Sequence, residues 1–268
     1  MSLSAEDIAQ AASDLIEAEV SRTQIGLLSL RHPNLDMDDA YAIQKGILDA
    51  KLAAGRRVIG WKIGLTSKAM QAALSIDIPD SGILFDDMIF EHGSTVPAGR
   101  FIQPRIEVEI AFVMKAAVGG AEVTRDDILA ATDYVAPSIE ILDTRIQRKD
   151  PETGKARIIT DTISDNAANA GIVVGLERHD PELVDLRWVG AIAKLNGEVE
   201  ETGLGAGVLN DPVESVVWLA QRMAQYGQKI EAGHVILSGS FIRPLECPPG
   251  SSVLADFGSF GSVAVDFA

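Results

Sequence analysis

Two kinds of hydrophobic pattern divide the chain unequally. Apolar residues recur at helical spacing over residues 4–30, with Ser4 as N-cap, and again over residues 35–55, where Gly55 is a stop signal. The pattern then changes to short runs rich in β-branched residues, separated by glycine and by the hairpin signal Asn196-Gly197. We expect strands within these runs, which cover residues 57–65, 105–114, 134–143, 171–175, 187–201, 233–241 and 252–267.

Few helices are expected among these strands. They begin at Thr124 and at Asp211, where Pro212 takes the first helical position. Many strands with few helices between them favour an α+β fold over an alternating, doubly wound sheet. The sequence therefore predicts one compact unit that consists of a helical N-terminal region, residues 1–57, and a β-rich region, residues 58–268.

The composition narrows the possible partners and the compartment. The 268 residues carry a net charge of −16, which argues against a nucleic-acid surface because such a surface needs a basic face. Cys247 is the single cysteine, so no intrachain disulfide can form. The acidic N-terminus does not resemble a signal peptide, and no apolar run approaches membrane-spanning length. We therefore expect a cytoplasmic protein that binds neither nucleic acid nor membrane.

The first candidate for chemistry is the run "RIEVEIAF" at residues 105–112. In a strand, residues two apart point the same way, so Glu107 and Glu109 share one face. One interpretation is a solvated outer face, where like charges cost little. The other is a site for a hard divalent cation, which needs clustered carboxylates and a further acid from elsewhere in the chain.

Glu140 is the acid that could complete such a site. It lies in the strand-like run "APSIEILD" between Ile139 and Ile141, and a buried, unpaired carboxylate is costly. A cation shared with the E-x-E pair would remove that cost, and a site made only of carboxylates suits Mg²⁺ or Mn²⁺ better than zinc. The alternative is an ion pair between Glu140 and Arg105 or Arg145.

Other polar residues could line a cleft. Lys62 lies between Trp61 and Ile63, so it either extends outward to solvent or is buried against a negative site. The segment "DIPDSGILFDDM" is predicted to be mostly loop and turn, and it offers four acids, of which one could be a general base: Asp77, Asp80, Asp86 and Asp87. The segment "DTISDNAANAG", residues 161–171, is predicted to be a loop rich in hydroxyl and amide groups.

Several familiar catalytic patterns are missing from the sequence. No G-x-S-x-G nucleophile elbow occurs, and the run "ETGLGAG" lacks the spacing and the lysine of a phosphate-binding loop. Cys247 has no evident base nearby, and the four histidines show no metal-ligand spacing.

The motifs as a set resemble the hydratase/decarboxylase branch of the fumarylacetoacetate hydrolase superfamily, nearly end to end. An E-x-E followed by a glutamate about thirty residues later is the metal signature of that superfamily. The stretches that carry the resemblance are "GWKIGLTSKAMQ", "PDSGILFDDM", "QPRIEVEIAFV", "ATDYVAPSIEILD", "SDNAANAG", "EETGLGAGVLNDP" and "LSGSFIRP".

The resemblance implies a mixed β-roll with an α+β N-terminal portion, a bound Mg²⁺ or Mn²⁺, and a homo-oligomer. It implies that Lys62 lies at the substrate and that Asp80 takes part in proton transfer. The remaining implied residues are the metal ligands Glu107, Glu109 and Glu140, and the substrate-lining residues Ser164, Asn166 and Ser240.

The implied activity is the metal-dependent addition of water to 2-oxo-hept-4-ene-1,7-dioate, which gives 4-hydroxy-2-oxoheptanedioate in the meta-cleavage breakdown of homoprotocatechuate. Two alternatives belong to the same branch: a decarboxylase of the 4-oxalocrotonate type and a hydratase of 2-hydroxypenta-2,4-dienoate. A hydrolase of acylpyruvates would need a base that activates water, and none of the histidines forms an evident dyad. A non-catalytic partner of another enzyme is the remaining alternative.

Overall fold

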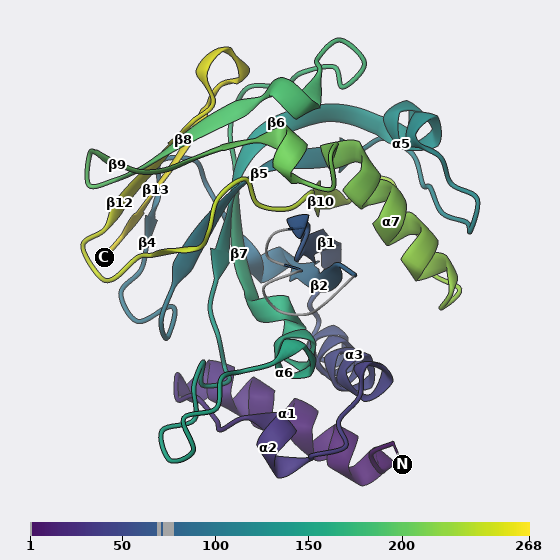
Figure 1. Ribbon diagram of the computed structural model, residues 1–268, viewed down its shortest axis with the longest axis vertical. Coiled ribbons are helices and arrows are strands. Elements are labelled where there is room, and N and C mark those ends of the chain that lie inside the picture. The colour runs from purple at the N-terminus through teal and green to yellow at the C-terminus, as the bar shows by residue number, and fades with distance from the viewer. Residues whose placement is uncertain (1, 69–70, 72–77) are drawn as a thin grey trace.

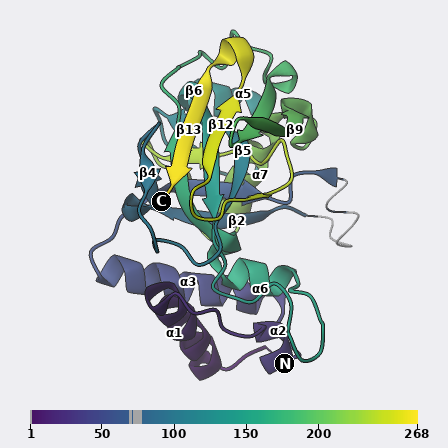
Figure 2. The same ribbon diagram turned by 90° about the vertical axis from the view of Figure 1, so that its left-hand side faces the viewer.

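The structure is a computed structural model that describes residues 2–68, 71 and 78–268. Asp77, one of the acids singled out above, lies outside the described residues. Figure 1 shows helices from the N-terminal part of the chain beneath a body of curled sheets, and Figure 2 shows α3 lying across the base of that body. Among the described residues, no helix has the length and apolar character needed to cross a bilayer.

The N-terminal region contains α1 (Ala5–Ser21), α2 (Leu28–Arg31) and α3 (Met37–Ala53). Ser4 caps α1 by accepting a hydrogen bond from the backbone N–H of Asp7, and Asp36 caps α3 in the same way. The single helix predicted over residues 4–30 is wrong beyond Ser21. Arg22 adopts the left-handed conformation there, with a φ of 55°, and this ends the helix.

These helices have a hydrophobic core of their own. Leu15, Leu28, Ile43 and Ile47 pack together, and Ile146 from the β-rich part of the chain completes the cluster. The Ser29 backbone N–H and hydroxyl also donate to the Asp161 carboxylate. Because the helices have this separate core, we propose that the chain forms one compact unit with two regions, and that the boundary between them lies near residue 57.

Two mixed sheets form the body. The larger has the order β2-β1-β10-β5-β6-β7-β3, with β11 also paired to β5, and the smaller has the order β4-β13-β12-β8-β9. The strands of the larger sheet are β1 (Val58–Gly64), β2 (Asp80–Phe85), β3 (Ile89–Phe90), β5 (Arg105–Met114), β6 (Thr132–Leu142), β7 (Asn169–Val174), β10 (Val235–Leu237) and β11 (Leu245–Glu246). Those of the smaller are β4 (Thr95–Val96), β8 (Gly190–Leu195), β9 (Glu198–Leu204), β12 (Ser252–Asp256) and β13 (Ser262–Phe267).

The other α-helices for which the described part of the chain gives bounds are α5 (Arg125–Ala131), α6 (Ile159–Ser164) and α7 (Pro212–Ala224). Thr124 and Asp211 cap α5 and α7, as the sequence predicts. Two segments predicted as loops are regular: residues 80–85 form β2, and residues 159–164 form α6. Turn-type residues misled both predictions, because tertiary contacts outweigh local propensity here.

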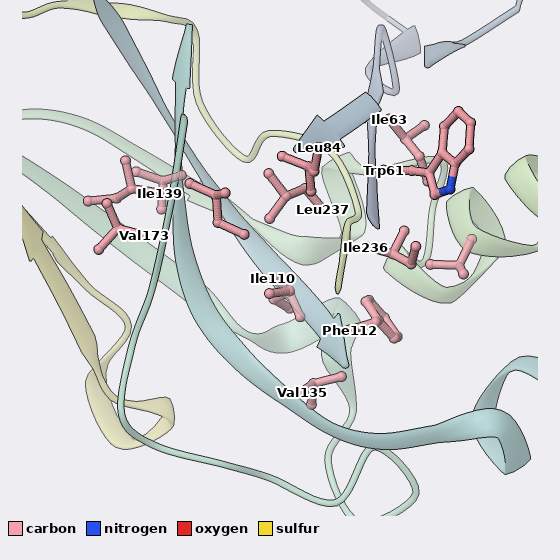
Figure 3. Packing of buried hydrophobic residues seen from close by; sticks show 14 of the residues in the cluster. Trp61, Ile63, Leu84, Ile110, Phe112, Val135, Ile139, Val173, Ile236 and Leu237 are labelled. Carbon is pink, nitrogen blue, oxygen red and sulfur yellow. The ribbon is translucent and has the colours of Figure 1, made fainter. Parts of the chain in front are cut away.

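One row of side chains across the larger sheet forms much of the core. Trp61, Ile236, Phe112 and Val135 are register partners on β1, β10, β5 and β6. Figure 3 shows them as part of a packed apolar cluster. Because neighbouring residues of a strand point to opposite faces, Lys62 on β1 lies on the other face of the sheet.

Candidate metal centre and active site

The register of β5 and β6 brings three carboxylates together. Glu107 and Glu140 are direct cross-strand partners, and Glu109 lies on the same face two residues along β5. One carboxylate oxygen from each residue lies within 4.8 Å of the others. The cluster that the sequence suggested is therefore assembled by a single strand pair.

The solvated-face interpretation of the E-x-E pair is wrong. Glu109 and Glu140 are both 0% exposed, and Glu107 is half-buried at the outer side of the cluster. Burial, together with the charge of Glu107, raises the pKa of Glu109 to about 8. Burial also raises the pKa of Glu140 well above its ordinary value. Without a cation, these raised pKa values favour the protonated forms of Glu109 and Glu140.

The hydrogen bonds of the cluster leave room for a cation. Glu109 Oε2 accepts from the Gly239 backbone N–H at 2.7 Å, whereas Glu109 Oε1 and both oxygens of Glu140 are buried without a hydrogen-bond partner. Buried carboxylate oxygens that lack hydrogen bonds and lie close together fit a hard divalent cation such as Mg²⁺. The alternative ion pairs are wrong as well, because Arg105 pairs with Glu246 and Arg145 pairs with Asp165.

Lys62 lies on the same face of the curled sheet as the cluster and reaches it across two intervening strands. Its Nζ lies 3.4 Å from Glu140 Oε1, although β10 and β5 separate β1 from β6 in the strand order. Only strong curling of the sheet, visible in Figure 1, allows this contact. Burial acts to lower the pKa of Lys62, but the surrounding carboxylates outweigh it and raise the pKa. Lys62 is thus a buried cation facing the cluster and does not extend to solvent.

Asp80 begins β2 and lies beside Lys62. The two meet over Gly64, where an added Cβ would lie 2.2 Å from Asp80 Oδ1 and 3.0 Å from Lys62 Nζ. Asp80 Oδ1 is buried without a hydrogen-bond partner, and burial raises the pKa of this carboxyl against the opposing charges of Lys62 and Arg157. Asp80 therefore has a free oxygen close to a cation, an arrangement suited to proton transfer.

The variant Gly64→Ala is expected to keep the fold and lose about 10²-fold in turnover. The new methyl group must displace the ends of the Asp80 and Lys62 side chains, and a misplacement of about 1 Å can cost that much. Steady-state kinetics alongside thermal unfolding measures both effects. The matched control is Gly207→Ala, where nothing lies within 4 Å. Wild-type turnover in Gly64→Ala would show that these two side chains do not act at the positions seen here.

Asn166 holds β2 in place. Its Oδ1 accepts from the Ile83 backbone N–H at 2.7 Å, and its Nδ2 donates to the Ile83 carbonyl oxygen at 2.9 Å. These bonds satisfy the outer edge of β2, which pairs with β1 on its other side. Asn166 begins a left-handed turn, in which it and the two following alanines have φ values of 50°, 53° and 59°. Both amide atoms are thus engaged by the backbone of β2.

Replacing Asn166 with alanine is expected to destabilise the fold by about 1–3 kcal/mol, because the buried Ile83 N–H loses its acceptor. Urea unfolding of the metal-free protein measures the change. Asn210→Ala is the control, since Asn210 is also left-handed, with a φ of 72°, but exposed. An equal loss in both variants would mean that the backbone conformation alone is responsible.

The other two predicted substrate-lining residues lie in different settings. Ser164 ends α6, is 0% exposed, and its hydroxyl has no hydrogen-bond partner. Ser240 follows Gly239 in the loop after β10, and its hydroxyl donates to the Ile242 carbonyl oxygen at 2.8 Å. The Ser164 hydroxyl is therefore buried without a partner, whereas Ser240 stabilises the loop that supplies the Glu109 hydrogen bond.

Sequence reasoning missed some residues of the site. Ser138 is the register partner of Glu109, and its hydroxyl donates to the Glu109 carbonyl oxygen at 3.0 Å. The two-residue spacing from Glu140 could have identified it. Gly64 and Gly82 give room to the Lys62 side chain, and no sequence signal distinguishes them from ordinary glycines. Burial raises the pKa of Cys247 to about 12, which is unsuitable for a thiolate nucleophile.

The comparisons with known proteins identify the family of the chain. The chain is 48% identical over 256 residues to the 2-oxo-hept-4-ene-1,7-dioate hydratase of Escherichia coli, with 96% of each chain covered. The chain belongs to the hydratase/decarboxylase branch of the fumarylacetoacetate hydrolase superfamily. No family model matches the chain.

Solved structures of the superfamily share the fold. The structure of 4-oxalocrotonate decarboxylase from Pseudomonas putida G7, complexed with magnesium and adipate, has a TM-score of 0.93 at 34% identity and covers 100% of this chain and 99% of its own. A fumarylpyruvate hydrolase from Pseudomonas aeruginosa has a TM-score of 0.57 at 12% identity over 78% of this chain and 88% of its own, a likeness of fold alone. The predicted mixed β-roll of the superfamily is confirmed.

Proposed function

We propose that this chain is a divalent-metal-dependent hydro-lyase that adds water to 2-oxo-hept-4-ene-1,7-dioate and forms 4-hydroxy-2-oxoheptanedioate. One observation carries the proposal: three clustered carboxylates, two of them with buried oxygens that lack hydrogen bonds, lie beside a buried lysine and a buried aspartate. The similarity to the hydratase of Escherichia coli supports the choice of reaction and substrate.

Glu107, Glu109 and Glu140 would hold the metal. A bound Mg²⁺ or Mn²⁺ supplies a Lewis acid for the carboxylate and keto oxygens of a 2-oxo acid. The Gly239 backbone N–H fixes the Glu109 carboxylate in its orientation, and the Ser138 hydroxyl ties the backbone of β5 to β6 behind it. These bonds keep the ligand oxygens in place before the substrate arrives.

Lys62 and Asp80 would serve the substrate. Removing a proton from C3 of the 4-ene and returning one to C5 gives the conjugated 3-ene, whose C4 is electrophilic. Water then adds at C4 and a proton is placed on C3, so the net change is the addition of one water molecule. Lys62 would stabilise negative charge on the substrate oxygen, and Asp80 would carry the proton or orient the water; their closeness to the carboxylates and to each other supports these roles.

Decarboxylation is the second candidate, because the chain has 34% identity and the same fold as a 4-oxalocrotonate decarboxylase. Both reactions would use the same enolate chemistry at the same residues. A single assay separates them: the seven-carbon, six-carbon and five-carbon dienoates are each incubated with the protein, with Mg²⁺ or with a chelator. We expect Mg²⁺-dependent hydration of the seven-carbon substrate in preference to the five-carbon one and no CO₂ release. Mg²⁺-dependent CO₂ release from 4-oxalocrotonate without hydration would overturn the proposal.

We also propose that the protein takes part in the breakdown of homoprotocatechuate in the cytoplasm, and that it forms a homo-oligomer. Support comes from a free, buried cysteine that fits a reducing compartment, and from the family resemblance. Light scattering after size-exclusion chromatography tests the oligomer. A mass equal to one chain, 28.5 kDa, would contradict it.

A further inference from the structure

A second pocket lies on the back of the two strands that carry Lys62 and Asp80. It has a volume of about 480 Å³ and lies between α3 and α7, with β1 and β2 as its floor. Trp61, Ser81 and Ile83 supply that floor. They alternate along the strands with Lys62, Asp80 and Gly82, so the pocket and the metal cluster lie on opposite faces of the same strand pair.

The pocket contains a guanidinium group that is positioned to bind an anion. Arg222 is held between two aromatic rings, with its Cζ 5.1 Å from the centroid of Tyr41 and 4.9 Å from that of Tyr226. It donates a hydrogen bond to the neutral Gln225 side chain at 2.9 Å, and it forms no ion pair with a carboxylate in the described parts of the chain.

The rest of the lining suits an apolar, flat ligand. Six of the lining residues have large apolar or aromatic side chains: Tyr41, Leu48, Trp61, Ile83, Met223 and Tyr226. Trp61 is 8% exposed, and its indole nitrogen is buried without a hydrogen-bond partner, so a donor is left over beside the cavity.

The charges around the pocket set the expected charge of the ligand. Lys45 also lines it, but this ammonium pairs with Asp49 at 2.5 Å. Asp38 lines it too and opposes a bound anion. Of the two cations in the lining, Lys45 and Arg222, only Arg222 lacks an ion-pair partner among the described residues, so one carboxylate on the ligand matches the available positive charge.

We propose that this pocket binds a small organic monocarboxylate with an aromatic or similarly flat apolar body. The carboxylate takes hydrogen bonds from Arg222, and the apolar body packs against Trp61 and Met223. The site is distinct from the metal cluster and its occupancy does not depend on metal.

Calorimetric titration with benzoate tests the proposal on the full chain, in chelator and again in Mg²⁺. We expect one benzoate per chain in both conditions. Arg222→Gln should weaken binding about 10- to 100-fold, because a charge-assisted hydrogen bond is lost. Asp38→Asn should tighten binding, which provides a second test if Arg222→Gln folds poorly. The exposed, Asp185-paired Arg187 gives the matched control Arg187→Gln, which should bind as the wild type does.

The proposal would be overturned by no benzoate binding, by binding unchanged in both Arg222→Gln and Asp38→Asn, or by binding of neutral benzyl alcohol as tight as that of benzoate. Because the titration needs no turnover, it is independent of the proposed hydratase activity. Binding that is lost in Glu140→Gln would place benzoate at the metal cluster, and would also overturn it.

Discussion

Lys62→Met is expected to lower kcat by about 10²–10³-fold, since the developing negative oxygen of the substrate loses its cationic partner in a dry site. Lys62 is 3% exposed and its ammonium lies 3.4 Å from Glu140. Methionine keeps most of the aliphatic stem, so the packing against Gly82 survives. Steady-state kinetics at saturating Mg²⁺ measures the loss. The variant removes the ammonium that faces Glu140, and a bound Mg²⁺ then provides a positive charge beside that carboxylate.

The split between kcat and KM identifies what the lysine does. A fall in kcat assigns Lys62 to the enolate, whereas a rise in KM alone assigns it to uniform binding of a substrate carboxylate. Lys155→Met, at an exposed position on the surface, is the control and should leave both parameters unchanged. Wild-type kinetics in Lys62→Met would remove the lysine from the mechanism.

Glu109→Gln is expected to abolish measurable turnover by weakening Mg²⁺ binding. The loss of affinity should exceed the roughly 10- to 100-fold typical for an outer-shell partner, because a direct ligand is removed. The fold should remain, since the variant relieves repulsion in a buried acidic cluster. Titration of Mg²⁺ into the metal-free variant measures the loss. The exposed Glu246, which pairs with Arg105, supplies the control Glu246→Gln.

The pH dependence of stability gives the same variant a second readout. Burial raises the pKa of Glu109 from 4.5 to about 8, so between these values the folded metal-free chain holds a proton that the unfolded chain has released. The free energy of unfolding of the wild type therefore falls as the pH rises through that window, because the folded chain must release this proton or keep it at increasing cost. Glu109→Gln should gain relative to the wild type as the pH rises, and the gain should level off above about pH 8. A constant difference across the window would contradict a buried, protonated Glu109.

The sequence predicts a structural feature correctly where the residues that determine it lie within one short segment. The alternation in "RIEVEIAF" placed Glu107 and Glu109 on one face of a strand, and the N-caps at Ser4 and Asp211 located helix starts. The Asn196-Gly197 turn was also correct, because its two positive φ values are a local demand of the hairpin.

Features that depend on contacts between distant parts of the chain could not be predicted from local sequence patterns. The contact between Lys62 and Glu140 depends on the curl of a whole sheet. The segment around Asp80 looked like a loop because Pro79 and Gly82 are turn residues, yet hydrogen bonds from β1 and Asn166 make it a strand. The pattern of residues offers four acids in this segment, and only the family resemblance selects Asp80 among them.

A crystal of the protein soaked in Mn²⁺ tests the metal assignment most directly, because the anomalous signal of manganese locates the ion. We expect one strong peak per chain between the side chains of Glu107, Glu109 and Glu140, at about 2.0–2.2 Å from an oxygen of each, and loss of that peak in Glu140→Gln. A Mn²⁺ ion that supports turnover but lies elsewhere, or a peak unchanged in Glu140→Gln, would contradict the three-carboxylate site.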